Sequence, residues 1–303
     1  MLKILFADDG SEASLRAARR LSAMAQWWTV DEMCVVNVQP APSGLGEPFS
    51  FELEQRAEGL ARMLGTGVVD ASLELFRGRY ASVTSSVVLG DAAVEIVSTA
   101  AQRESTLIAV GSHGASSPIG FPIGSVTMKV LHLAGCGVLV FPAHQTAASS
   151  PYGPPQRPLR ILLPVDGSAG SLAAVREVVR VAPSFTAPPE IHLLTVYDRT
   201  PLDEEIGAMV SADALADYER NHLEEALRPA RGLLASTVLR VIEHTEMGPT
   251  ALRIQSVAQD QACDMVCIGM HGHGTLRDKL LGSTTSKLLH VSALPILAVP
   301  SRE

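Results

Sequence analysis

The sequence contains one internal repeat, and this repeat limits the fold more than any other feature. Six residues of the first half recur 158 positions later: Gly90, Gly111, Gly114, Gly124, His132 and Pro142. Near the start of each half stands Asp-Gly-Ser, in FADDGS and LPVDGS, where Asp9 and Asp166 differ by 157 positions. Self-similarity at a fixed period indicates duplicated units. We therefore expect two copies of one domain in tandem.

A segment without apolar periodicity separates the two copies. It reads AHQTAASSPYGPPQRP, residues 143–158, and is rich in Pro, Ser, Ala and Gly. Such a composition is typical of a semi-extended linker. We place the first domain at residues 1–143, the linker at 144–157 and the second domain at 158–303.

Each copy alternates short apolar runs with amphipathic stretches. KILFAD and RILLPVD have the length of strands, and SEASLRAARRLSAMAQ and SAGSLAAVREVVRVA follow with helical spacing behind a serine N-cap. The pattern continues to five strands per copy, although glycines interrupt the helical region at residues 51–80. This alternation predicts an α/β fold, with a doubly wound, mainly parallel five-stranded sheet and helices on both faces in each domain.

The candidate site lies where two strands end. In doubly wound sheets, ligands bind beyond the carboxyl ends of the strands, near the point where the strand order reverses. Asp9 and Asp166 follow the first strand of their copies, and a glycine-rich loop follows the fourth strand. We therefore expect one site per domain, with the aspartate facing the loop.

Both loops fit the pattern G-x2-G-x9-G-S. They read GSHGASSPIGFPIGS (111–125) and GMHGHGTLRDKLLGS (269–283). Glycine lets a ligand approach the backbone closely, and the last Gly-Ser opens a helix whose unpaired N–H groups favour an anion. Ser283 and Thr284 add hydroxyl donors. Neither loop contains GK[ST], and no GxGxxG follows the first strand, so the sequence is neither a P-loop NTPase nor a typical NAD-binding domain.

With these motifs, both halves resemble the universal stress proteins, whose fold is related to other adenine-nucleotide α-hydrolase-like domains. The resemblance rests on DGS after the first strand, on GSHG and GMHG, and on the spacing that marks the ATP-binding branch of the family. It implies that Asp9 and Asp166 lie near the adenosine, and that Val38 and Val196 meet the adenine edge through backbone groups. The two loops would hold ribose and phosphates, commonly with Mg²⁺ or Mn²⁺ on the phosphates. The residues concerned are Gly111, His113, Gly114, Gly124 and Ser125 in the first loop and Gly269, His271, Gly272, Gly282, Ser283 and Thr284 in the second.

The expected function is that of a tandem universal stress protein that binds ATP, AMP or another adenine nucleotide and signals by conformation or association. The resemblance also implies that the two domains pair through their last strands, GVLVFP and PILAVP, and it leaves a homodimer of chains open. Two alternatives remain: an ATP-using enzyme on the same fold, and a structural pseudo-dimer with empty pockets. No set of nucleophile, base and orienting group can be assembled, so we expect at most weak ATP hydrolysis.

The two loops differ between their shared glycines. The second loop carries Arg277 and Lys279, which attract phosphate, whereas the first carries Pro118 and Pro122 and no charge. We therefore expect the second domain to be the better nucleotide site.

Several residues also have simpler interpretations. Asp9 and Asp166 can form turns or cap the following helices without any ligand. His113 and His271 either donate to phosphate or are exposed loop residues. His132 and His290 are expected at packing or surface positions. The loops themselves can serve as tight turns.

Composition narrows the class of protein further. A net charge of -8 and only 4% aromatic residues argue against nucleic-acid binding. The N-terminus lacks the pattern of a signal peptide and no apolar run is long enough to span a membrane, so we predict a cytoplasmic location. We expect no metal site in protein side chains, because His271 and His273 lack a third ligand and Cys263 and Cys267 lack a second pair. The four cysteines are expected to be free thiols.

Overall fold

The computed structural model describes residues 1–41, 51–114, 123–142, 157–199, 205, 209–272 and 281–301, with the side chains of 51–54 left out. The chain divides into two compact units, Met1–Pro155 and Gln156–Glu303, which we call the first and the second domain. This division falls inside the predicted linker, whose residues 144–156 lie outside the described part.

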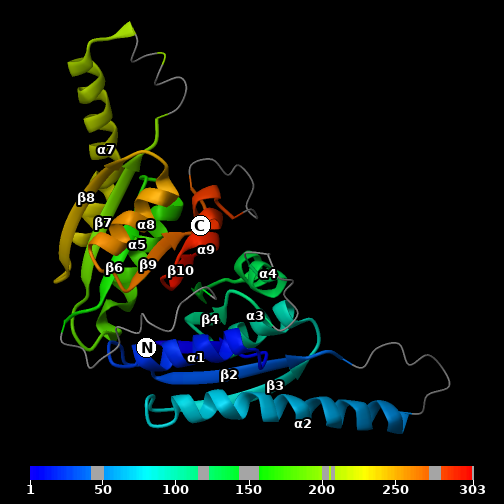
Figure 1. The fold of residues 1–303 in the computed structure, drawn as a ribbon. Coiled ribbons are helices and arrows are strands. Elements are labelled where there is room, and N and C mark those ends of the chain that lie inside the picture. The colour runs from blue at the N-terminus through cyan, green and yellow to red at the C-terminus, as the bar shows by residue number, and fades with distance from the viewer. Residues whose placement is uncertain are drawn as a thin grey trace. The chain divides into compact units, whose positions relative to one another are not determined.

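The first domain alternates strands and helices in the predicted order (Figure 1). Its elements are β1 (Lys3–Ala7), α1 (Glu12–Met24), β2 (Glu32–Gln39), α2 (Phe51–Phe76), β3 (Val83–Leu89), α3 (Ala92–Gln102), β4 (Leu107–Gly111), α4 (Ser125–Leu133) and β5 (Gly137–Phe141). The strand order is β3-β2-β1-β4-β5, and every neighbouring pair within the domain is parallel. Helix α1 packs against α2 and α3 against α4, one pair on each face of the sheet.

The second domain repeats this plan. Its elements are β6 (Arg160–Pro164), α5 (Ala169–Val181), the short 3-10 helix η1 (Ala182–Ser184), β7 (Glu190–Tyr197), α7 (Ala212–Leu234), β8 (Arg240–Met247), α8 (Thr250–Asp260), β9 (Met265–Gly269), α9 (Ser283–Val291) and β10 (Ile296–Val299). The order is β8-β7-β6-β9-β10, again with parallel pairs. The predicted fold, two tandem doubly wound α/β domains, is therefore confirmed.

The topology creates one crevice in each domain. The chain leaves β1 for β2 on one side and later places β4 on the other side of β1. The connections from β1 and β4 therefore diverge at the carboxyl ends of these strands, which is the switch point where such sheets bind ligands. In the second domain, β6 lies between β7 and β9 in the same way.

Serine caps begin the first helix of each domain, as the sequence predicts. The Ser11 hydroxyl oxygen accepts a hydrogen bond from the backbone N–H of Ser14, and that of Ser168 accepts from Ser171. Asp9 and Asp166 therefore do not occupy the N-cap positions, and the cap interpretation of these two aspartates is wrong.

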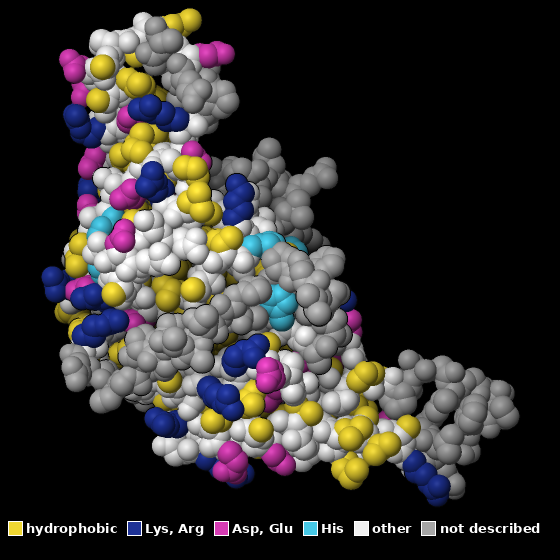
Figure 2. Space-filling view, viewed as in Figure 1, with side chains coloured by type: hydrophobic (Ala, Val, Ile, Leu, Met, Phe, Trp, Pro, Cys, Tyr) yellow, Lys and Arg dark blue, Asp and Glu magenta, His cyan; other side chains and the backbone are white. Residues whose placement is uncertain are grey.

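Helix α2 runs without a break through the glycines that interrupt its pattern. A Cβ atom placed on Gly65 would lie 2.5 Å from a methyl group of Val87 and 2.7 Å from Asn37 Oδ1. Glycine here lets the helix approach the sheet closely. This explains why a residue that disfavours helix formation stands inside α2. On the outer side of α2, Leu60, Met63 and Leu64 are exposed, and Figure 2 shows hydrophobic side chains gathered over this helix.

Strand β8 begins at Arg240. The Thr237 hydroxyl donates to the carbonyl of Leu234, so Thr237 belongs to the turn that ends α7. Of the cysteines, Cys34, Cys263 and Cys267 are buried and Cys136 is half-buried, and all four are free. Within the described ranges, no helix is long and apolar enough to cross a membrane.

Candidate functional site

Each Asp-Gly-Ser segment forms the same turn at the end of the first strand. Asp9 Oδ1 accepts from the backbone N–H of Ser11 at 3.0 Å, and Asp166 Oδ1 accepts from that of Ser168 at 2.9 Å. The intervening glycines have φ angles of 76° and 80°, a region that residues with a Cβ atom rarely adopt. The side chain of each aspartate therefore stands at a fixed place beyond its strand.

The second glycine of each loop lies directly against this aspartate. A Cβ atom on Gly114 would lie 2.5 Å from Asp9 Oδ2, and one on Gly272 would lie 3.2 Å from Asp166 Oδ2. The aspartate and the loop therefore face each other across the crevice in both domains. The paired motifs DGS and G-x2-G are explained by this close approach.

The first glycine of the loop has a packing role in the second domain. A Cβ atom on Gly269 would overlap the carbonyl of Gly170 at the start of α5. The Thr285 hydroxyl then donates to the carbonyl of Gly269 at 2.8 Å, and Thr127 does the same to Gly111. A threonine from the last helix thus fixes the end of the fourth strand in each domain.

The third glycine begins the last helix. The N–H of Gly282 donates to the carbonyl of Met270 at 2.7 Å, and that of Gly124 donates to the carbonyl of Ser112 at 2.7 Å. Neither Gly124 nor Gly282 provides a side-chain cap to its helix. The first-turn N–H groups of α4 and α9 are therefore without a capping side chain at the N-cap, where a helix favours an anion.

The second-domain crevice holds a cavity of about 600 Å³. Its lining includes the eight residues that the sequence predicts to contact the nucleotide in this domain: Asp166, Val196, Gly269, His271, Gly272, Gly282, Ser283 and Thr284. Apolar side chains, among them Leu194, Ile254 and Ile268, complete one part of the wall. Thr250 and Ser286 also line the cavity and had no signal in the sequence.

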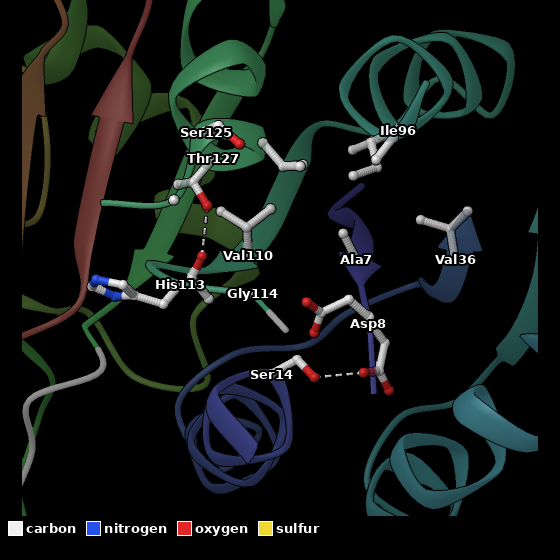
Figure 3. A pocket seen from close by; sticks show the side chains of 15 residues that line it. Ala7, Asp8, Ser14, Val36, Ile96, Val110, His113, Gly114, Ser125 and Thr127 are labelled. Carbon is white, nitrogen blue, oxygen red and sulfur yellow. Dashed lines mark hydrogen bonds between the residues drawn. The ribbon is translucent and has the colours of Figure 1, made fainter. Parts of the chain in front are cut away.

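The first-domain crevice holds a much smaller cavity, about 90 Å³ (Figure 3). Of the predicted residues, Asp9, Gly111, His113, Gly114, Gly124 and Ser125 line it. Val38 is not part of this lining, and Val36 of the same strand is. Figure 3 shows Asp8 and Ser14 on one side and Ser125 and Thr127 on the other.

Asp8 is a buried residue of the first-domain site that the sequence did not identify. It is 5% exposed, and its carboxylate accepts from the N–H of Gly10 and the hydroxyls of Ser14 and Ser72, at 2.9, 2.6 and 2.5 Å. Ser72 comes from α2, far away in the sequence, so no local pattern could indicate this contact. At the equivalent position the second domain has Val165.

The histidines of the two loops lie in similar surroundings, each near a serine hydroxyl. His113 Nδ1 lies 2.9 Å from Ser112 Oγ, and His271 Nδ1 lies 3.3 Å from Ser301 Oγ; both residues line their cavities. His132 and His290 are exposed on α4 and α9, as expected. Pro118, Pro122, His273, Arg277 and Lys279 lie outside the described residues.

In the described part of the chain, no group of three or more His, Cys, Asp or Glu side chains could hold a metal ion. The chemistry of the second-domain site is that of binding: an apolar wall, a carboxylate at a fixed place and a helix start rich in hydroxyls.

Comparison with known proteins gives one consistent family. The model of the Universal stress protein family matches residues 1–142 and 159–300. A universal stress protein of Methanocaldococcus jannaschii is 28% identical over 148 residues, which cover 48% of this chain and 84% of that protein. One of Mycobacterium tuberculosis is 24% identical over 250 residues, or 82% of this chain and 79% of that protein.

Among solved structures, a universal stress protein from Archaeoglobus fulgidus aligns with 99% of this chain and 98% of its own, with a TM-score of 0.68 and 20% sequence identity. At this identity the likeness concerns the fold. Together with the family matches over both halves, it shows that the chain belongs to the universal stress protein family, as a tandem of two such domains.

Proposed function

We propose that this protein binds an adenine nucleotide, ATP or AMP, and that binding changes its conformation or association as a signal in a stress response. The observation that carries the proposal is the second-domain cavity, which lies at the switch point and has all eight predicted residues in its lining. Its volume of about 600 Å³ falls within the range of about 300–1,000 Å³ that is typical of small-molecule sites.

The lining offers a complementary place to each part of a nucleotide. Leu194 and Val196 suit a purine base, because they line the cavity with apolar residues of strand β7. The Asp166 carboxylate suits a ribose hydroxyl, which donates a hydrogen bond to it. Ser283, Thr284 and the start of α9 suit the phosphates. We propose that Mg²⁺ or Mn²⁺ enters with the phosphates rather than on a cluster of protein side chains.

Binding measurements test this function directly. Calorimetry with ATP, AMP, adenosine and GTP is expected to show preferred binding of the adenine compounds to the full chain, and chelation of divalent ions tests their part. The absence of any binding would favour the structural pseudo-dimer. Steady-state ATP hydrolysis well above the background rate would favour the enzyme.

We also propose that the two domains pair through β5 and β10. Within its own domain, each of these strands has a hydrogen-bonded neighbour on one side only. Both strands are apolar, GVLVF and ILAV, and carry no charge to protect an open edge. Association of two chains into a homodimer and a cytoplasmic location remain predictions. Light scattering with and without ATP measures the association.

A further inference from the structure

The two cavities share one architecture but have rims of opposite charge. In each domain, the helix after the third strand contributes its first turn to the cavity, through Ala92 and Ile96 of α3 and through Thr250 and Ile254 of α8. The charged residues on and beside this turn differ between the copies. This difference concerns the phosphate end of any nucleotide, because helix starts are where phosphates bind.

In the first domain, acidic side chains occupy this rim. Asp91 caps α3 by accepting from the N–H groups of Ala93 and Val94 at 3.1 and 3.3 Å, and it pairs with Lys129 of α4 at 3.3 Å. The N–H of Val94 and the ammonium of Lys129 lower the pKa of Asp91, so the carboxylate stays charged. Glu95 folds over Gly90, where a Cβ atom would lie 3.0 Å from Glu95 Oε1.

In the second domain, the equivalent positions carry no acid. Pro249 replaces Asp91, and α8 has no side-chain cap at its N-cap. Arg253 replaces Glu95 and folds over Gly248 in the same manner, with Nε 3.2 Å from the place of a Cβ atom. Lys287 is the counterpart of Lys129, and it follows directly after the cavity-lining segment Ser283–Ser286.

The charges therefore favour a phosphorylated ligand in one domain only. Among the described residues, Asp8 and Asp9 line the first-domain cavity, and Asp91, Glu95 and the cation Lys129 lie beside its lining. In the second domain, Asp166 lines the cavity, and the cations Arg253 and Lys287 stand next in the chain to the lining residues Ile254 and Ser286. Glu246, a further acid, lies on β8 in register with Val196, and like Arg253 and Lys287 it is outside the cavity lining. The cavity volumes, about 90 Å³ in the first domain and about 600 Å³ in the second, also favour a ligand in the second domain.

We propose that the chain binds one nucleotide, in the second domain, that Arg253 and Lys287 attract and contact its phosphates, and that the first-domain cavity excludes phosphorylated ligands. This proposal rests on the proposed nucleotide-binding function. Neither cation belongs to the glycine loop. We infer the role of both from the comparison of the two domains. In the first domain Asp91 pairs with the ammonium of Lys129, whereas Pro249 at the equivalent position offers Lys287 no carboxylate.

The test places first-domain residues in the second domain of the full chain. Pro249→Asp fits the backbone, because Pro249 has φ and ψ of -56° and 113° and Asp91 has -74° and 122°. Calorimetry with ATP is expected to give one site per chain. Pro249→Asp, Arg253→Glu and Lys287→Gln are each expected to weaken ATP binding at least tenfold and to leave adenosine binding unchanged. The matched first-domain variants Glu95→Gln and Lys129→Gln are expected to change neither ATP binding nor adenosine binding.

The outcomes separate this proposal from the function on which it rests. Binding of neither ATP nor adenosine to the unaltered chain would overturn both. Two ATP sites per chain, or an equal loss of affinity in Lys129→Gln and Lys287→Gln, would overturn the inference and leave nucleotide binding intact. Equal weakening of ATP and adenosine by the three second-domain variants would also overturn it, because phosphate contacts affect only the phosphorylated ligand.

Discussion

Gly282 stands where a side chain would enter the second-domain cavity. Its φ and ψ, -59° and 145°, suit any residue, so the need for glycine there comes from space rather than backbone strain. A Cβ atom on Gly282 would lie 3.2 Å from the carbonyl oxygen of Met270 and 3.7 Å from backbone atoms of His271 and Gly272. The loop glycines thus allow close approach of the neighbouring backbone.

We predict that Gly282→Val abolishes nucleotide binding while the chain stays folded, because the two methyl groups occupy space that the phosphates need. Calorimetry measures the binding and circular dichroism the fold. Gly124→Val, the equivalent change in the first domain, is the matched control and is expected to leave affinity and stoichiometry unchanged. A folded Gly282→Val chain with unaltered binding would show that the site is wrongly assigned.

We predict that Asp166→Asn weakens nucleotide binding by about tenfold or more, because hydrogen bonds to a charged group contribute about 1.5–3 kcal/mol. The turn itself is retained, since an asparagine oxygen accepts from the Ser168 N–H as Asp166 does. Asp9→Asn is expected to leave binding unchanged. Equal losses in the two variants would contradict the difference between the domains.

At the scale of elements, the packing of α2 depends on where its glycines lie. Gly65 contacts Val87 and Asn37, whereas a Cβ atom on Gly59 would meet nothing within 4 Å. We predict that Gly65→Ala lowers the free energy of unfolding by about 1–3 kcal/mol through overpacking. Gly59→Ala is expected to raise it by about 0.5–1 kcal/mol, because alanine favours a helix. Urea denaturation measures both, and the same sign for the two changes would be inconsistent with the observed packing.

Strands β7 and β8 are joined by two stacked histidines. His192 Nδ1 lies 3.0 Å from His244 Nε2, and His192 Nε2 lies 3.1 Å from Glu190 Oε1. Burial lowers the pKa of His192 below its ordinary value, with Glu190 opposing this shift and Arg160 and Arg240 adding to it. Burial and then His192 lower the pKa of His244, with Glu246 opposing. The first domain has Cys34 and Ser86 at these positions.

This pair makes the stability of the protein depend on pH. Near pH 6.5 the histidines of the unfolded chain take up protons that the folded chain does not accept. We predict that the free energy of unfolding falls as the pH drops below about 6.5, toward the lowered pKa of the folded state, and stays level above it. Urea denaturation at pH 7.5 and pH 5.5 checks this. The double variant His192→Cys with His244→Ser is expected to lose part of the dependence, and an unchanged slope would contradict the assignment.

Much of the element pattern was predictable because each strand is an apolar run between polar turns. The serine caps and the meeting of Asp166 with Gly272 follow from local motifs and parallel topology. The continuity of α2 was not predictable, because Gly65 is explained only by its contact with Val87. The Ser72 contact of Asp8 likewise depends on tertiary packing, which a local pattern does not reveal.

At the scale of the whole molecule, duplication produced two similar domains with unequal cavities. The repeat revealed the common plan, and the same comparison shows where the copies diverged: Asp8 against Val165, Asp91 against Pro249 and Glu95 against Arg253. The second-domain cavity is the larger of the two, about 600 against about 90 Å³.

The proposed pairing of the domains has a direct signature in amide exchange. In an open edge strand, alternate N–H groups point away from the sheet and exchange with solvent quickly, whereas a strand paired on both sides is protected throughout. We predict slow exchange at successive amides of β5 and β10, measured by nuclear magnetic resonance on the intact chain. An alternation of fast and slow amides along either strand would contradict the pairing.

The central claim is that one domain of the two binds an adenine nucleotide. Native mass spectrometry of the full chain, titrated with ATP and compared with the Gly282→Val variant, tests it most directly. We predict that the unaltered chain saturates with one added ATP and that the variant gains none. A chain that gains no ATP, or one that saturates with two, would contradict this claim.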